Sequence, residues 1–252
     1  MIGSTRYADR AEAGQVLAAE LVRTVDPALL AGDPGGADPG GTDSVGADSV
    51  GADSVGADSD RADSDRAGPV VLALPRGGVP VAVPVAAALG TTVSVLVVRK
   101  LGAPGQPELA IGAIATIGNR VEQVLNTDWV RRLGLSDRRL ARLIERETAI
   151  LRDRVAVFGA APPVAGRVVI IVDDGLATGA TMRAAVAAVR RAGASFVIAA
   201  APVGAAEACH DLARLADFVI CPRSRDPFRA VGEHYRDFTQ VDDAEVARLL
   251  SS

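Results

Sequence analysis

The feature that most constrains this 252-residue chain is the stretch 168–189, with the sequence VVIIVDDGLATGATMRAAVAAV. Its first five residues are apolar and β-branched without alternation, which is typical of a strand buried on both faces. Asp173 and Asp174 stand where this strand ends, a loop of small residues and threonines follows, and an Ala-rich helix begins near Thr181. A strand, two carboxylates, an amide-rich loop and a helix N-terminus together predict a phosphate site beside acceptors for hydroxyl groups.

A second unit of the same kind comes earlier in the chain. The apolar run 70–74 predicts a short buried strand, the sequence PRGG follows it, and a helix is expected over about 79–89. In this turn Gly77 and Gly78 allow backbone amides to approach an anion closely, and Arg76 adds a guanidinium. Turns between a strand and a helix also use glycine for steric reasons alone, so the unit gains its weight from the first stretch.

The single lysine of the chain, Lys100, follows a predicted strand over 92–98. Ligands of open α/β sheets lie outside the carboxyl ends of the strands, so Lys100 is expected at the same edge as the two loops. The other basic residues, of 27 in all, are arginines. The lysine therefore indicates a site that requires a compact ammonium, with chance survival at the surface as the alternative. Residues 101–109, with two glycines and two prolines, predict a mobile loop over this edge.

The low-complexity tract 31–68 repeats the unit DSVGA three times from Asp43, and its nine aspartates and two arginines give it a net charge of −7. A period of five matches neither helix nor strand, so we expect disorder, with a binding tail as the alternative. The rest of the chain holds 25 basic and 22 acidic residues. This mildly positive balance suits a small polyanion and is too weak to indicate a nucleic-acid partner.

Several other classes of site are not indicated. The longest apolar run, 79–89, is broken by prolines and is too short to span a bilayer, and the N-terminus lacks a signal pattern. We therefore expect a cytoplasmic protein without a membrane partner. Cys209 and Cys221 show neither CxxC nor metal-ligand spacing, so no zinc site is predicted.

These patterns predict an α/β fold with one core, interrupted twice. The C-terminal segment contains three aromatic residues, which either cover a planar ring or anchor that segment: Phe228, Tyr235 and Phe238. The expected regions are an N-terminal helix packed on the core (1–30), a disordered insertion (31–68), the core itself (69–102 and 164–222), a flexible loop with an α+β insertion subdomain (103–163), and a C-terminal hood or flap (223–252).

The sequence VDDGLATGAT resembles the 5-phosphoribosyl-1-pyrophosphate (PRPP) signature of the type I phosphoribosyltransferases. The PRGG turn combined with RKLGAPGQPELAIGAIA also resembles a bacterial branch of that family with an RGG pyrophosphate loop. The resemblance covers about 70–100 and 165–221. It implies an open, mostly parallel, doubly wound sheet, a flexible loop, and a hood over the acceptor.

The resemblance also implies roles for individual residues. Asp173 and Asp174 would bind the ribose 2- and 3-hydroxyls and would hold Mg²⁺, directly or through water. Lys100 and the loop of Arg76, Gly77 and Gly78 would bind pyrophosphate, and the family often has a non-proline cis peptide in that loop. The 5-phosphate would be held by Gly175, Leu176, Ala177, Thr178, Gly179, Ala180 and Thr181.

The implied activity is that of a pentosyltransferase of nucleotide metabolism and nucleobase salvage. It would displace pyrophosphate from ribose C1 through an oxocarbenium-like transition state, with Asp173, Asp174, Lys100 and Arg76 in the catalytic site. The acceptor is expected to be a nitrogenous base. Hypoxanthine–guanine members carry an Asp before the TG of the signature, and Ala177 in its place argues against a 6-oxopurine.

Two alternatives follow from the same residues. A non-catalytic protein that senses PRPP or nucleotides would need the same ligand contacts as an enzyme. The Arg-rich helix predicted over 136–157 either pairs two subunits in a homodimer or presents a solvated face.

Overall fold

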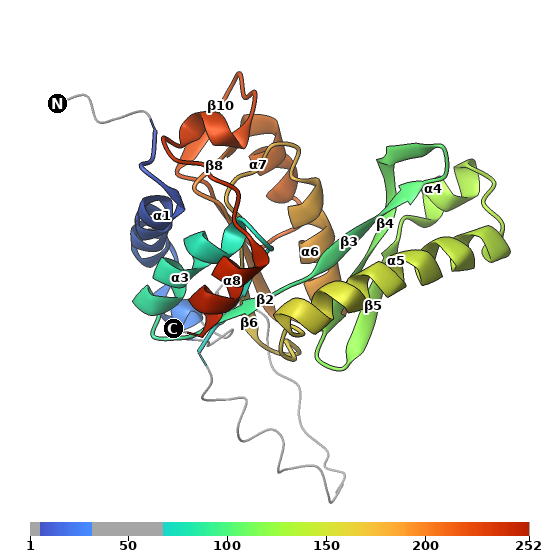
Figure 1. The fold of residues 1–252 in the computed structure, drawn as a ribbon, viewed down its shortest axis with the longest axis horizontal. Helices are drawn as coiled ribbons and strands as arrows, with labels where there is room; N and C mark the ends of the chain where they lie inside the picture. The colour runs from blue at the N-terminus through green and yellow to red at the C-terminus, as the bar shows by residue number, and fades with distance from the viewer. Residues whose placement is uncertain (1–5, 32–67, 252) are drawn as a thin grey trace, which may run out of the picture.

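The structure, a computed structural model, describes residues 6–31 and 68–251. The low-complexity insertion expected over 31–68 therefore lies outside the described residues, apart from its two ends. A parallel sheet with the strand order β2-β1-β6-β7-β9 forms the centre of the molecule (Figure 1). Its strands are β1 (Val70–Ala73), β2 (Val93–Val95), β6 (Val168–Val172), β7 (Phe196–Ala200) and β9 (Phe218–Ile220).

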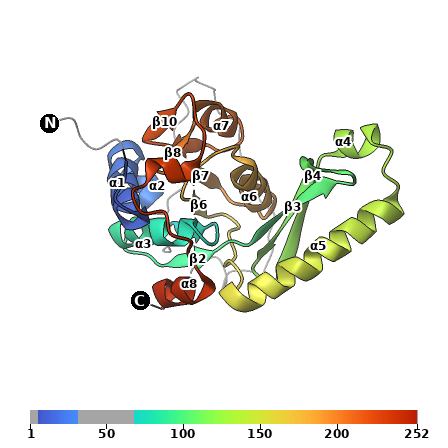
Figure 2. The same cartoon turned by 45° about the horizontal axis from the view of Figure 1, so that its top comes forward.

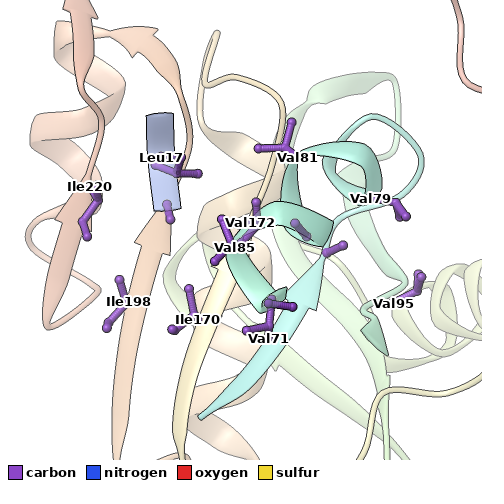
Figure 3. Close-up of a cluster of buried hydrophobic side chains, with 14 of the residues drawn as sticks. Leu17, Val71, Val79, Val81, Val85, Val95, Ile170, Val172, Ile198 and Ile220 are labelled. Carbon is purple, nitrogen blue, oxygen red and sulfur yellow. The ribbon is translucent and has the colours of Figure 1, made fainter. Parts of the chain in front are cut away.

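Helices cover both faces of this sheet because its strands are apolar on both sides. Val71, Ile170 and Ile198 belong to one hydrophobic cluster, which also includes Leu17 and Val85 (Figure 3). That cluster packs under α1 (Arg10–Thr24), α2 (Pro27–Leu30) and α3 (Gly78–Ala88). The alternate residues of the same strands pack under α6 (Ala180–Arg191) and α7 (Ala206–Leu212). The doubly wound, mostly parallel α/β fold is confirmed.

An arm extends from this core, built from the antiparallel sheet β3-β4-β5 (Figures 1 and 2). Its strands are β3 (Val98–Ala103), β4 (Gln106–Ile117) and β5 (Arg120–Leu125), followed by α4 (Thr127–Arg132) and α5 (Asp137–Phe158). The arm sheet contacts α5 as well as α6 of the core. Leu151 of α5 and Ile114 of β4 are fully buried and join the arm to the core cluster.

The arm corrects two expectations. The predicted strand 92–98 ends at Val95, because the chain leaves the parallel sheet at Leu96 and Val97 and pairs again in β3. Residues 101–109 are not a loop but the facing ends of β3 and β4. Register shifts around Gly102 absorb the irregular sequence there, and Gly105, with φ +80°, occupies the turn between the two strands.

The C-terminal part folds back over the carboxyl edge of the sheet. It comprises β8 (Val203–Ala205), β10 (Arg223–Arg225), the 3-10 turn Val231–His234 and α8 (Asp243–Leu250). Residues 203–205 pair in parallel with β10, so α7 begins only at Ala206. Tyr235 is buried against Tyr7, whose hydroxyl donates to the Pro202 carbonyl at 3.0 Å. Of the two alternatives for the tail aromatics, Tyr235 therefore acts as an anchor.

Candidate active site

Two strand–loop–helix units leave the central sheet side by side. Strands β1 and β6 are parallel neighbours, and the amide of Leu74 donates to the Val172 carbonyl at 2.9 Å, which extends their pairing to the edge of the sheet. The first loop, residues 74–77, leads into α3, and the second loop, residues 173–179, leads into α6. Parallel pairing thus brings the residues of both predicted motifs to one edge.

Gly77, at the end of the first loop, and Gly78, the first residue of α3, allow the two loops to touch. A Cβ on Gly78 would lie 2.6 Å from the Val172 carbonyl oxygen, and a Cβ on Gly77 would overlap the Asp174 carboxylate. No other residue type fits at either position without displacing the second loop. The peptide bond between Pro75 and Arg76 is cis.

Asp174 is held from two sides by the terminal segments of the chain. The Nε of Arg10, in α1, donates to Asp174 Oδ2 at 2.9 Å, and the Tyr235 hydroxyl donates to the Asp174 carbonyl at 2.6 Å. The guanidinium of Arg10 also stacks on the Phe238 ring at 3.9 Å and donates to the Thr239 carbonyl. Both partners of the ion pair are largely buried, with 11% and 16% of their side chains exposed. The pair is therefore shielded from water far better than a surface pair.

The two carboxylates differ in their electrostatic surroundings. Burial raises the pKa of Asp173 well above its ordinary value, and the neighbouring Asp174 charge raises it further. Burial also raises the pKa of Asp174, but the positive charge of Arg10 and its hydrogen bond oppose that rise. The Asp173 Oδ1 accepts a hydrogen bond from the Asp174 amide at 2.9 Å. Asp173 is consequently the harder of the two to ionise without a cationic or hydrogen-bonding ligand.

The second loop encloses a hollow of about 140 Å³, lined by Asp173 and residues 175–182. Gly179 has φ +67°, a left-handed conformation that turns the chain into α6. Among the described residues, no acceptor faces the amides of Ala177, Thr178 and Gly179. With the positive end of the α6 dipole behind them, these donors favour an anion in the hollow.

Contacts from the core fix the geometry of the second loop. Leu176 is buried and exchanges two hydrogen bonds with β8, from its own amide to Val203 at 2.9 Å and from the Ala205 amide to its carbonyl at 2.8 Å. The side chain of Arg183, on the first turn of α6, donates to the Thr178 carbonyl at 2.6 Å. These contacts anchor the loop to β8 and α6.

Neither Arg76 nor Lys100 lines the hollow of the second loop. Arg76 points toward α8, with its Nη1 3.5 Å from Asp243 Oδ1, and Asp243 Oδ2 lies 3.6 Å from the Arg154 guanidinium of α5. Lys100 is not at the end of a core strand but on β3 of the arm, paired in register with Ala113. It lines a cleft of about 500 Å³ that also includes Ala180 and Arg183 of α6.

The two carboxylates suit one kind of metal. Within residues 6–31 and 68–251, no group of three or more His, Cys, Asp or Glu side chains is arranged to bind a metal ion. Two hard carboxylates beside a hollow lined by backbone amides nevertheless match Mg²⁺, which retains water and ligand phosphate oxygens in its coordination shell. Asp173 and Asp174 are the residues that could hold it.

Of the helices in residues 6–31 and 68–251, none has both the length and the apolar character of a membrane span.

Sequence reasoning brought the two loops together correctly but missed the residues that support them. Arg10, Arg183, Tyr235 and Asp243 all contact predicted site residues. None belongs to a motif, and Arg10 is 164 residues away from its partner. The charges of Arg10, Arg183 and Asp243 are shared by many other arginines and aspartates in the chain, and Tyr235 stood out only as one of the tail aromatics.

Known proteins resemble this chain in sequence and in structure. The phosphoribosyl transferase domain model matches residues 57–235. Two relatives from Mycobacterium tuberculosis, from strains CDC 1551 and H37Rv and each named "Putative phosphoribosyl transferase", are 46% identical over 184 residues. This match covers 72% of the chain but only 41% of each relative, so the chain spans about two fifths of their length.

The crystal structure of the protein TT1426 from Thermus thermophilus matches over almost the whole molecule. The TM-score is 0.72 at 35% sequence identity, and the match covers 97% of both chains. The match therefore includes the arm as well as the core. By the family model, which covers most of its length, the chain belongs to the phosphoribosyl transferase domain family.

Proposed function

We propose that this protein is a phosphoribosyltransferase that binds PRPP with Mg²⁺, transfers the phosphoribosyl group to a nitrogenous base and releases pyrophosphate. The observation that carries the proposal is the direct contact between the two loops at Gly77 and Asp174. One loop offers a phosphate hollow, the other offers backbone amides and Arg76, and the two carboxylates lie at their junction. A sugar with phosphate groups at both ends matches this order of groups.

The 5-phosphate would occupy the hollow lined by residues 175–182. Amides of the loop and the hydroxyls of Thr178 and Thr181 would donate to its oxygens, and the α6 dipole would add to the attraction. Gly175 packs against Val231 of the C-terminal segment, which closes one wall of this region.

The ribose hydroxyls would donate to Asp173 and Asp174. Ionised carboxylates only accept hydrogen bonds, so they select a ligand with vicinal hydroxyl donors. Arg10 supports this role, because its charge favours the ionised form of Asp174 and its hydrogen bond fixes the orientation of the carboxylate. A bound Mg²⁺ would add positive charge beside the leaving pyrophosphate.

The pyrophosphate would contact the amide of Gly77 and the side chain of Arg76, while the Gly78 amide donates to the Leu74 carbonyl at 3.0 Å and lets the chain turn close to the ligand. For this contact Arg76 would exchange its long 3.5 Å contact with Asp243 for the ligand. Charge develops on the leaving group in the transition state, so a guanidinium held there lowers the barrier. We propose that Lys100 contributes in the same way when the arm moves toward the core and excludes water.

The acceptor would approach ribose C1 from the side covered by the C-terminal segment. Ala177 is exposed and offers a methyl group where hypoxanthine–guanine enzymes carry a carboxylate. We therefore propose a base other than a 6-oxopurine, in a reaction of nucleobase salvage.

Pyrophosphate release from PRPP, measured against a panel of nucleobases, tests the proposal. We expect Mg²⁺-dependent release with at least one base and no release when Asp174 is replaced by Asn. Tight PRPP binding without release for any base would instead support a PRPP-sensing protein on the same fold. Absence of PRPP binding would refute both.

A further inference from the structure

The fold brings together two cysteines that show no recognisable spacing in the sequence. Cys209 lies on α7, and Cys221 directly follows β9. Both sulfur atoms converge on Gly204 of β8, where an added Cβ would lie 2.9 Å from Cys209 Sγ and 3.1 Å from Cys221 Sγ. Both residues remain partly exposed to solvent.

The surroundings of the two sulfurs make them chemically unequal. Hydrogen bonding with the Cys221 thiol, and to a smaller extent with Ser224, lowers the pKa of Cys209 to about 7 against the opposing effect of burial. The same hydrogen bond and burial raise the pKa of Cys221. Cys209 is therefore a partly exposed thiolate near neutral pH, whereas Cys221 keeps its proton. This division is typical of an attacking cysteine and a resolving cysteine.

We propose that Cys209 and Cys221 are a reversible redox pair that is oxidised to a disulfide by hydroperoxides. The Cys209 thiolate attacks one oxygen of hydrogen peroxide, the O–O bond breaks, and hydroxide leaves, which gives a sulfenic acid on Cys209. The Cys221 sulfur then attacks the Cys209 sulfur, and the sulfenic oxygen leaves as water with the Cys221 proton. The two cysteines together lose two electrons, which reduce the peroxide. A dithiol reductant reverses the reaction by thiol–disulfide exchange.

The position of the pair connects it to the phosphate loop. Gly204 also touches Leu176, since its added Cβ would lie 3.0 Å from the Leu176 Cβ, and Leu176 is hydrogen-bonded to both neighbours of Gly204. A disulfide would draw α7 and the end of β9 toward each other at Gly204. It would therefore act on β8, the strand that supports Leu176. We therefore expect oxidation to weaken phosphate binding in the hollow. This consequence, unlike the redox chemistry, rests on the proposed function.

Peptide mass spectrometry of the full chain after treatment with hydrogen peroxide tests the redox pair. We expect a peptide linked through Cys209 and Cys221 that disappears with dithiothreitol. In Cys221→Ser, dimedone should trap a sulfenic acid on Cys209, whereas Cys209→Ser should leave Cys221 unmodified. The absence of the linked peptide, or equal reactivity of the remaining cysteine in both variants, would overturn the inference.

Two further measurements separate the inference from a general reactivity of exposed thiols. The rate of iodoacetamide labelling at Cys209 should rise with pH around neutrality. Ser224→Ala should move this rise to higher pH, and an unchanged profile would contradict the effect assigned to Ser224.

Calorimetry with PRPP should show at least threefold weaker binding to the oxidised chain than to the reduced chain. Equal affinities would overturn the coupling to the loop, while a reduced chain that fails to bind PRPP would refute the proposed function and leave the disulfide result standing.

Discussion

The two strand–loop–helix units at the edge of the sheet share a plan but use glycine for opposite purposes. In the first unit, Gly77 and Gly78 are packed against the second loop, and there is no room for a side chain. In the second unit, Gly179 adopts a left-handed conformation, and the loop around it encloses a hollow. The first unit is thus specialised for close approach and the second for presenting free amides. A glycine-rich turn by itself does not reveal which of these applies.

The units also differ in what supports them. The second loop is fixed from the core, through the hydrogen bonds of Leu176 to β8. The first loop depends on its partner, because Gly77 contacts Asp174 and Arg76 reaches only an exposed carboxylate on α8. We expect substitutions in the first loop, or in the residues that hold Asp174, to disturb both halves of the site. Substitutions in the second loop should have local effects.

The largest effect is expected for Gly77→Ala. Its Cβ would overlap the Asp174 carboxylate and displace it from Arg10, so PRPP affinity should fall by about 100-fold, equivalent to about 2.7 kcal/mol.

Gly179→Ala is the matched control. Its Cβ would meet the Ala208 Cβ at an ordinary 3.4 Å, and the left-handed backbone alone should cost about 1–2 kcal/mol in unfolding free energy. Calorimetry and thermal melting measure both; similar losses of affinity in the two variants would refute the proposed difference between the loops.

Asp173→Asn should separate binding from stability. The folded-state pKa of Asp173 is raised, so the folded chain binds more protons than the unfolded chain, and stability falls as pH rises above the ordinary Asp range. At pH 7 the asparagine removes a buried charge next to Asp174. We expect Tm to rise by a few degrees, which corresponds to about 1 kcal/mol, while PRPP affinity falls by about tenfold.

The control for this variant is the pH dependence of its stability. Near pH 4 the wild-type carboxyl is largely protonated, so the difference in Tm between the two proteins should shrink. A lower Tm of the variant at pH 7 would show that Asp173 stabilises the fold and contradict the assigned pKa shift.

Arg10→Gln tests the support that α1 gives to Asp174. Loss of the guanidinium should raise the pKa of Asp174 further, because the effect of burial would no longer be opposed by the charge and the hydrogen bond of Arg10. In the proposed site PRPP binds to the ionised carboxylate, so as pH falls the affinity of the variant should begin to drop at a higher pH than that of the wild type. Calorimetry between pH 5 and 8 measures this shift. Arg23→Gln, at an exposed arginine of the same helix, should follow the wild-type profile.

The smallest effect is expected for Thr178→Val, within the second loop. The Thr178 hydroxyl accepts from the Ala180 amide at 3.3 Å and is exposed to the hollow. Its loss should cost about 1 kcal/mol, or about fivefold in affinity for ribose 5-phosphate. Pyrophosphate binding should not change, and an equal loss for both ligands would contradict the division of the site into two loops.

Local patterns in the sequence were sufficient to predict the parts of the site that depend on strands and turns. The uninterrupted apolar run of β6 and the PRGG turn after β1 placed Asp173, Gly77 and the second loop on one edge, because parallel strands share their carboxyl ends. The ion pair of Arg10 with Asp174 has no such local cause. It depends on how α1 packs across the sheet, which no spacing in the sequence specifies.

The arm shows where local patterns mislead. Glycines and prolines over 101–109 predict a loop, yet pairing with a neighbouring strand overrides their low strand propensity. The same pairing places Lys100 on the arm and not at the end of a core strand. The cysteines show the opposite failure, since the spacing between Cys209 and Cys221 gives no hint that both sulfurs meet at Gly204.

The central claim is that the two loops bind opposite ends of one ligand. Isothermal titration of the wild-type chain with PRPP, ribose 5-phosphate and pyrophosphate, each with Mg²⁺, tests it most directly. We predict that PRPP binds at least tenfold more tightly than either fragment, because it engages both loops at once. PRPP that binds no more tightly than ribose 5-phosphate would show that the loop of Arg76, Gly77 and Gly78 contributes nothing, and would contradict the account.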